Sequence, residues 1–215
     1  MLPRWGRGVR SPQARIALLR LNPGEGAPAC GLQSEGGMNQ VPSNVGSAGP
    51  APKPQQHFLE LLCEFDIANV ITRARAEEGG LHGRPMAIAK VEDDGTLWFV
   101  TSVDSPKVLE IRDDSRAMVS LQNSRQFVSI NGHFELVTDR AKVDELWKES
   151  YRVWFEGEND PELVLLRFTP FDAEFWDNAG ARGIKYAFEA AKAYLKGQKM
   201  DPSEFDPEAH ARLQL

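Results

Sequence analysis

The sequence contains little cysteine, with only Cys30 and Cys63 among 215 residues. Two cysteines supply no disulfide framework, and this scarcity favours a reducing compartment and a cytoplasmic location. Long hydrophobic runs are also missing, since none approaches the roughly 20 apolar residues of a membrane-spanning helix. The chain lacks an excess of basic charge, because 25 Lys and Arg residues face 31 Asp and Glu residues and give a net charge of −6. This balance argues against a protein that binds nucleic acid or anionic membranes nonspecifically.

Several motifs of common enzyme classes are absent as well. The sequence has no GxGxxG and no P-loop, so two common nucleotide-binding fingerprints are missing. The histidines are His57, His82, His133 and His210. They show no metal-ligand spacing with each other or with the cysteines, so we expect no metal site. No Ser-His-Asp arrangement can be identified, and the sequence points to no catalytic residue.

The composition changes near residue 54. Residues 1–54 are rich in Gly, Pro, Ser and Ala and hold six basic and two acidic residues, whereas the rest of the chain holds 19 basic and 29 acidic residues. A segment of this kind buries too little apolar surface to offset its ordering entropy, so we expect weak order there. We expect one folded domain over 55–180, followed over 181–215 by a helix and a loose acidic tail.

Hydrophobic periodicity predicts a chain dominated by strands. Helical spacing or a helix-start signal predicts helices over 57–65, 105–114, 139–155 and 184–195. β-type stretches predict strands over 69–76, 82–92, 96–102, 116–123, 126–138 and 162–177, the last being one strand or two joined at Pro170. The turn Asp93-Asp94-Gly95 is a strong hairpin signal. Short connections favour an antiparallel barrel or sandwich with a few helices over a doubly wound parallel sheet.

Single residues add three expectations. We expect His82 to be a turn residue rather than part of a site. Asn131 and Gly132 interrupt a long strand and favour a β-bulge or bend there. Trp147 and Trp154 fall on one stripe of the predicted helix over 139–155, which indicates packing rather than a cofactor role.

The junction over 99–107 has the composition of a small anion site. Thr101, Ser102 and Ser105 supply hydroxyl groups, and Ser105 suits a helix N-cap with a proline at the first helical position. The helix start offers free backbone N–H groups, and Lys107 adds a full positive charge. These groups fit one phosphate monoester. The same residues also fit an ordinary capped helix start with an exposed lysine, and both interpretations stay open.

Arg84 strengthens the phosphate interpretation. It opens the strand over 82–92, which we expect to form a hairpin with the strand over 96–102. The start of one hairpin strand lies beside the end of the other, so Arg84 would reach the end that holds Thr101. Its planar guanidinium group suits phosphate oxygens, although an arginine at a strand end is also common on a plain surface.

The sequence also resembles a known family. Four stretches occur in family order and with family-like spacing, namely 83–89 (GRPMAIA), 97–111 (LWFVTSVDSPKVLEI), 126–147 (QFVSINGHFELVTDRAKVDELW) and 160–177 (DPELVLLRFTPFDAEFWD). They resemble the FMN-binding split β-barrel proteins related to pyridoxamine 5′-phosphate oxidase, and within them the general stress protein branch. The resemblance covers 57–177. It implies a mainly β fold, a six-stranded antiparallel Greek-key-like split barrel with flanking helices, in a homodimer that holds FMN at the subunit interface.

The resemblance also implies which residues bind the flavin. They are Arg84, Thr101, Ser105 and Lys107 at the phosphate, Met86 and Ala87 along the isoalloxazine ring, Val100 beside Thr101, Gln126 from the partner subunit, and Trp176 near the flavin. The junction over 99–107 adds the hydroxyl of Ser102 to this set.

The sequence departs from the oxidase pattern in four places. Pro106 replaces a second basic residue, and Ala89 replaces a lysine. The spacing from Gln126 to Gly132 is one residue longer than in the oxidase. The Arg-x-His element that binds the vitamin phosphate has no counterpart after Trp176. We therefore expect no pyridoxamine phosphate oxidation, although the flavin site is implied.

The leading expectation is a flavin-dependent oxidoreductase of a bacterial stress response, with NAD(P)H as one candidate donor and the substrate open. FAD could replace FMN if the phosphate end is open to solvent. One alternative is a flavin-binding or sensing protein without turnover. Others are a deazaflavin (F420) reductase and a haem protein on the same barrel. We expect neither nucleic acid nor membrane partners.

Overall fold

A computed structural model describes residues 29–30, 54–76, 79–178 and 210–215. In these ranges the helices are α1 (Pro54–Cys63), α2 (Pro106–Asp113), α3 (Arg140–Leu146) and a 3₁₀ helix, η2 (Glu149–Val153). The strands are β1 (Ala29–Cys30), β2 (Ile67–Arg73), β3 (Leu81–Ala87), β4 (Lys90–Val91), β5 (Leu97–Ser102), β6 (Arg116–Gln122), β7 (Gln126–Val137), β8 (Leu163–Asp177) and β9 (His210–Gln214). Outside the described residues lie the predicted helix over 184–195 and most of 1–54.

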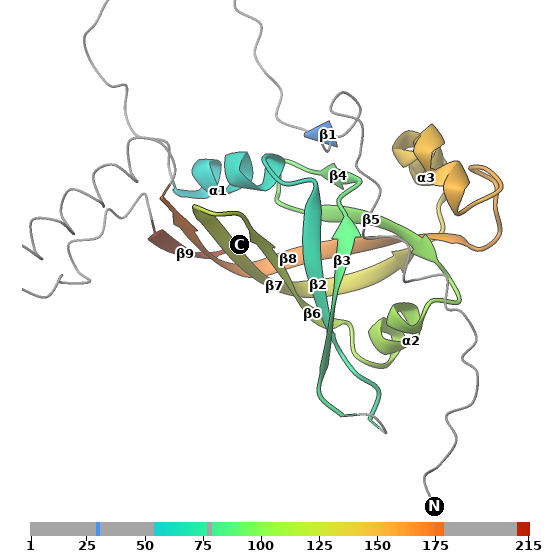
Figure 1. The fold of residues 1–215 in the computed structure, drawn as a ribbon, viewed down its shortest axis with the longest axis horizontal. Helices are drawn as coiled ribbons and strands as arrows, with labels where there is room; N and C mark the ends of the chain where they lie inside the picture. The colour runs from blue at the N-terminus through green and yellow to red at the C-terminus, as the bar shows by residue number, and fades with distance from the viewer. Residues whose placement is uncertain (1–28, 31–53, 77–78, 179–209) are drawn as a thin grey trace, which may run out of the picture.

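The described strands form one curled sheet (Figure 1). The order is β1-β4-β5-β8-β7-β6-β2-β3, and β9 pairs with β8. All pairings are antiparallel except the short one between β1 and β4. The fold is therefore the mainly β split barrel with flanking helices that the family resemblance implies, and it agrees with the antiparallel arrangement that the short connections predict. The six predicted strands correspond to the strands of six or more residues, to which β1, β4 and β9 add short pieces.

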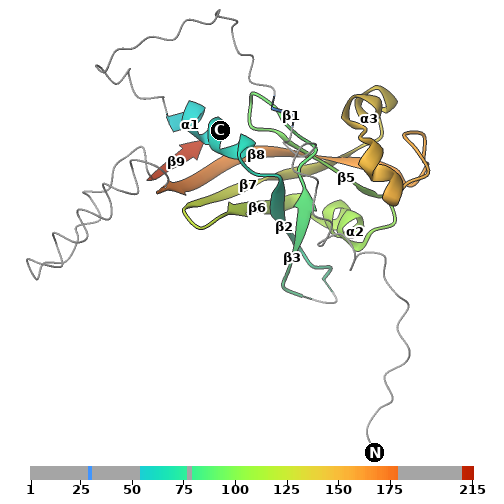
Figure 2. The ribbon, with the colours of Figure 1, turned by 45° about the horizontal axis from the view of Figure 1, so that its top comes forward.

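Helix α1 covers the core at the end of the sheet where β7 begins (Figure 2). Its residues Phe58, Leu61 and Leu62 are fully buried, at the i, i+3, i+4 spacing of one helix face. The Phe58 ring stacks on Phe175 of β8, with the ring centroids 6.5 Å apart. At the same end, the His57 imidazole lies 2.9 Å from a carboxylate oxygen of Asp177. Burying each large apolar side chain contributes about 1.5–3 kcal/mol, so α1 is an integral part of the barrel.

The predicted strand over 82–92 is two strands, and this corrects the expected pairing of Arg84. Strand β3 pairs with β2, with Arg84 opposite Val70, whereas only β4 pairs with β5 across the turn ending at Gly95. The chain changes partner between them, because the Ile88 amide donates to the Asp66 carbonyl and the next amide donates to Trp98 on β5. Strand β3 is an edge of the described sheet, which accommodates the missing N–H of Pro85.

The predicted helix over 139–155 ends early. Helix α3 stops at Leu146, Trp147 is extended with a ψ of 135°, and the chain restarts as η2. A continuous helix would carry Phe155 about 13 Å along its axis from Leu146. Instead the chain turns back, so that both residues join one apolar cluster with Trp98. Trp147 and Trp154 therefore do not share a helix stripe.

The bulge expected near Asn131 is confirmed, and β8 is one strand rather than two. Asn131 pairs with Asp172 and Gly132 with Pro170, so the register shifts by one residue on β8. A Cβ on Gly132 would lie 2.5 Å from the Phe168 ring and from a backbone oxygen, so only glycine fits. The bulge also accommodates a proline within the strand.

Two expectations about the ends of the domain need correction. The last residues, expected to be loose, form β9, with Trp176 opposite His210. The scarcity of cysteine favours a reducing compartment, whereas Cys63 is disulfide-bonded. No helix among the described residues is long and apolar enough to cross a membrane.

Candidate functional site

Helix α2 begins directly behind β5, as the junction over 99–107 predicts. Ser105 is the N-cap and Pro106 opens the helix. The Ser105 hydroxyl makes no capping hydrogen bond and lies 3.4 Å from the Thr101 hydroxyl. The two side chains thus present a pair of hydroxyl groups at the positive end of α2.

Lys107 is buried, which excludes the interpretation of an exposed lysine at a plain helix start. Its ammonium group donates to the Thr101 hydroxyl over 2.8 Å. Among the described residues, no carboxylate lies within ion-pair distance of it. Burial lowers the pKa of Lys107 to about 8, with a further lowering from nearby Arg84 that Glu110 opposes. A buried cation with one neutral partner is costly, and a bound anion would compensate for it.

Arg84 reaches the same place from β3, although it does so without the expected hairpin. Its guanidinium group donates to the Thr72 hydroxyl over 2.7 Å and to Glu110 Oε2 over 2.7 Å. Thr72 donates to the same Glu110 oxygen over 2.5 Å. Glu110 is 3% exposed, so α2 contributes a buried carboxylate as well as a buried ammonium group.

His82 completes this network, and it lies on β3 rather than in a turn. Its Nδ1 is 2.6 Å from Glu110 Oε1. Burial raises the pKa of Glu110, but hydrogen bonds from Thr72, His82 and Arg84 together lower it below its usual value. Glu110 is therefore a carboxylate at neutral pH and shares the cationic site with Arg84 and Lys107.

A hollow of about 800 Å³ lies between β3 and α2, and its lining includes His82, Arg84, Lys107 and Glu110. We call it the α2 hollow; its walls are residues 81–84 of β3, Arg75 beyond the end of β2, and one side of α2. Figure 2 shows α2 beside the β2–β3 pair. The walls of the α2 hollow combine cationic groups with the apolar side chains of Leu81 and Leu109. These leucines are 69% and 42% exposed, respectively.

The remaining predicted residues near this site have different surroundings. Met86 is buried and Ala87 is exposed, farther along β3. Val100 is half-buried against the apolar cluster around Trp98. The Ser102 hydroxyl accepts from the Asp104 amide over 3.3 Å, so it serves the turn before α2.

Gln126 and Trp176 do not reach the α2 hollow within one chain. Thr101 pairs with Val164 near the start of β8, whereas Trp176 lies twelve residues farther along that strand, about 40 Å when measured along it. Trp176 is 37% exposed and stacks on His210, with the ring centroids 4.9 Å apart. Gln126 is buried, and its side chain bonds to Glu64 and Asn123. Within one chain, Gln126 and Trp176 therefore lie at the opposite end of β8 from Thr101.

The sequence analysis did not predict that Thr72, Arg75 and Glu110 belong to the site. It interpreted His82 as a turn residue. Glu110 follows Lys107 by three residues, so both lie on one face of α2. That spacing could have been a signal, but a charged pair on a short helix usually indicates a solvated face. Thr72 and His82 are opposite each other on β2 and β3, which becomes visible only once the strand pairing is known.

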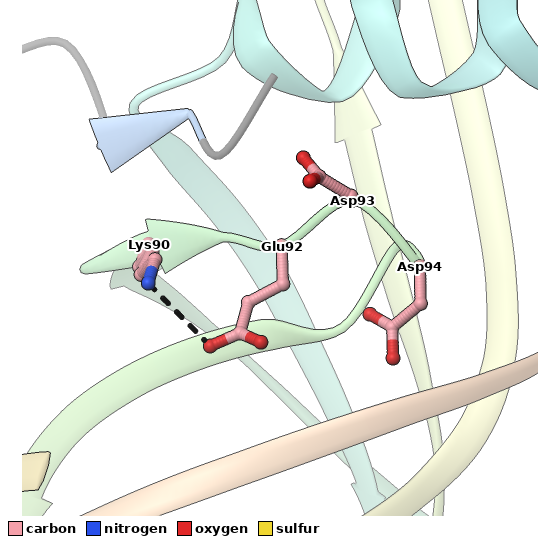
Figure 3. A pocket seen from close by; sticks show the side chains of 4 residues that line it. All are labelled: Lys90, Glu92, Asp93 and Asp94. Carbon is pink, nitrogen blue, oxygen red and sulfur yellow. Dashed lines mark ion pairs between the residues drawn. The ribbon is translucent and has the colours of Figure 1, made fainter. Parts of the chain in front are cut away.

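A second hollow, of about 330 Å³, lies at the turn between β4 and β5 (Figure 3). Lys90 and Glu92 form an ion pair there at 3.7 Å. Asp94 accepts from the Thr96 amide over 2.9 Å, so it stabilises the turn. No group of three His, Cys, Asp or Glu side chains in the described part of the chain could hold a metal ion. This hollow is a feature of the β4–β5 hairpin.

Comparison with known proteins adds evidence on relationship. A family model described as pyridoxamine 5′-phosphate oxidase like matches residues 53–201. General stress protein 26 of Bacillus subtilis (strain 168) is 25% identical over 133 residues, which span 60% of this chain and 91% of that protein.

Solved structures show the same fold. The general stress FMN/FAD binding protein of Xanthomonas citri has a TM-score of 0.51 and 31% identity, covering 59% of this chain and 90% of that one. A protein assigned as general stress protein 26 from Jannaschia sp. CCS1 has a TM-score of 0.55 and 23% identity, covering 74% of this chain and 97% of that one.

Proposed function

Because the chain belongs to the pyridoxamine 5′-phosphate oxidase like family, we propose that it is a flavin-binding stress protein that anchors the flavin phosphate at the start of α2. The observation that carries the proposal is the buried ammonium group of Lys107, which has only a hydroxyl partner in the described structure. The Bacillus subtilis relative named general stress protein 26 and the Xanthomonas citri relative named FMN/FAD binding protein support this function.

The residues present fit a phosphate group. Lys107 and Arg84 supply charge-assisted donors, and Thr101 and Ser105 supply hydroxyls on the same side. Arg84 has a planar fork, so it can keep one hydrogen bond to Glu110 while it turns another N–H to a ligand. The phosphate would accept a hydrogen bond from Lys107 and compensate the positive charge of its site.

In this proposal the flavin ring lies along β3 towards Met86 and Ala87. Strand β3 is an edge strand of the described sheet, so its outer backbone groups are available to ring atoms. FMN itself would supply the electron or hydride chemistry. The protein would position the phosphate, orient the ring and exclude water from one ring face.

A homodimer would complete the site. We propose that Gln126 and Trp176 of the partner subunit approach the flavin, since the same residues of one chain lie far from Lys107. Exposed apolar side chains on the sheet, Phe127 at 43% and Trp176 at 37%, provide surface that a second subunit would cover. Redox turnover of a substrate other than pyridoxamine phosphate, with NAD(P)H as a donor, is the finer part of this proposal.

Calorimetric titration of the flavin-free protein with FMN and with riboflavin tests the phosphate anchor. We expect FMN to bind at least tenfold more tightly than riboflavin, and we expect Arg84→Ala to weaken FMN by about 10- to 150-fold, since a charge-assisted hydrogen bond contributes about 1.5–3 kcal/mol. Equal affinities for FMN and riboflavin would refute the anchor. Anaerobic NAD(P)H addition then separates turnover, seen as flavin bleaching, from binding alone.

A further inference from the structure

The α2 hollow is larger than a single phosphate requires. Its volume of about 800 Å³ falls in the range of sites for whole small molecules, about 300–1,000 Å³. It extends along β3 from Arg84 to Leu81 and on to Arg75. This direction leads away from Met86 and Ala87, where the proposed ring lies. A group bound in the rest of the hollow would therefore be attached to the phosphate end of the flavin.

The charges at the anchor also fit a phosphate that carries one negative charge better than one that carries two. Arg84 and Lys107 are positive and the buried Glu110 is negative, so the three groups leave one positive charge. A phosphate monoester loses its second proton near pH 6 and carries almost two negative charges at neutral pH. Each phosphate of a pyrophosphate diester carries only one. The negative charge of Glu110 therefore weakens the binding of the doubly charged phosphate of a mononucleotide more than that of a singly charged phosphate in a dinucleotide.

The far part of the hollow has the groups that a second phosphate and a nucleoside need. The Arg75 side chain is half-exposed, and its ion pair with Asp113, 3.1 Å long, lies at the surface. Such exposed pairs contribute little, so Arg75 can turn to another anion at small cost. Leu81 and Leu109 are exposed apolar side chains on either side of the hollow and could pack against the faces of a base.

We infer, on the basis of the proposed function, that the α2 hollow is the site for the second phosphate and the adenosine of FAD, so that this chain prefers the dinucleotide flavin to FMN. Arg75 binds the second phosphate, and Leu81 and Leu109 contact the adenine. Glu110 sets the preference by reducing the positive charge beside the first phosphate.

The experiment compares FMN and FAD by calorimetry on the flavin-free full-length protein at pH 7.5. The expected dissociation constant for FAD is at least tenfold below that for FMN. Arg75→Ala should raise the constant for FAD about tenfold and leave that for FMN unchanged. Arg73→Ala is the matched control, because Arg73 also pairs with an aspartate at the surface, Asp114 at 3.5 Å, but lies outside the hollow. It should change neither constant.

Two further variants test the roles of charge and apolar contact. Glu110→Gln should strengthen FMN relative to FAD, which a purely structural role of Glu110 would not do. Because Glu110 is buried and its variant could fold poorly, the exposed Leu109→Glu provides an independent test and should weaken FAD alone.

The outcomes distinguish this inference from the function on which it rests. FMN that binds as tightly as FAD, with no effect of Arg75→Ala on either, overturns the dinucleotide site and leaves the phosphate anchor standing. Failure of both flavins to bind overturns the proposed function together with the inference.

Discussion

Replacement of Lys107 by methionine should have opposite effects on flavin binding and on stability. Methionine keeps the length of the buried side chain and removes its charge. Wild-type Lys107 is buried with a hydroxyl as its hydrogen-bond partner, and burial lowers its pKa to about 8 from the usual 10.5. The flavin-free protein therefore keeps the charged form at a cost in stability, which the variant avoids.

The magnitude follows from the pKa. The difference between 10.5 and about 8 corresponds to about 3 kcal/mol against the charged form at neutral pH. Loss of the hydrogen bond to Thr101 offsets about 1 kcal/mol of this gain. The flavin-free variant should thus be more stable by about 2 kcal/mol, or about 4–8 °C in Tm for a domain of this size.

The pH dependence has a definite sign. Since the unfolded chain holds the Lys107 proton more tightly than the folded one, this residue makes wild-type stability rise as pH increases from about 8 towards 10.5. The variant should lack that contribution. In the same range, loss of the ammonium charge should weaken the binding of the flavin phosphate in the wild type.

Urea denaturation of the flavin-free proteins and flavin titration by calorimetry measure the two effects. We expect the flavin dissociation constant of the variant to increase about 10- to 150-fold, from the loss of one charge-assisted hydrogen bond. Lys90→Met, which removes a cation that pairs with Glu145 at the surface, is the control and should leave flavin binding unchanged. A Lys107→Met protein that is less stable than the wild type and binds flavin equally well would refute the reasoning.

Three further predictions concern the barrel and the proposed dimer. Gly132→Ala should destabilise the protein by about 1–3 kcal/mol, because the new Cβ would lie 2.5 Å from the Phe168 ring; an unchanged urea midpoint would disprove the close approach. Phe58→Ala should lower the free energy of unfolding by about 3–5 kcal/mol, since this side chain of α1 is fully buried. A decrease of less than 1 kcal/mol would mean that α1 is not part of the core. Mixing a Lys107→Met protein with a Trp176→Ala protein should give mixed dimers with one intact flavin site, seen as partial recovery of bound flavin. Absence of recovery in demonstrated mixed dimers would contradict a site shared between subunits.

The sequence predicted the parts of the site that are local in the chain. Thr101, Ser105 and Lys107 lie within seven residues, and both the N-cap and the helix start could be read from them. Their burial could not, because a lysine in a short helix has the same pattern whether it faces solvent or core. The structure removes that ambiguity, because Lys107 is buried and its ammonium group donates to Thr101.

The parts that depend on strand pairing could not be predicted. Between Ile88 and Ala89 the chain changes its hydrogen-bonding partner from the start of β2 to β5. No glycine or proline marks a break at this point. The sequence pattern over 82–92 therefore predicts one strand. The contact of Arg84 with Glu110 could not be predicted from it. The C-terminal strand had a signal that was overlooked, since Ala211 and Leu213 alternate with polar residues and pack against the core.

The most direct test of the account is the absorbance spectrum of the purified protein after incubation with flavin and removal of the excess by desalting. The account predicts that the wild type keeps the visible absorption bands of a flavin and that Lys107→Met, folded and at equal concentration, loses them. A folded wild-type protein that stays colourless after this treatment would contradict the proposed flavin site at the start of α2.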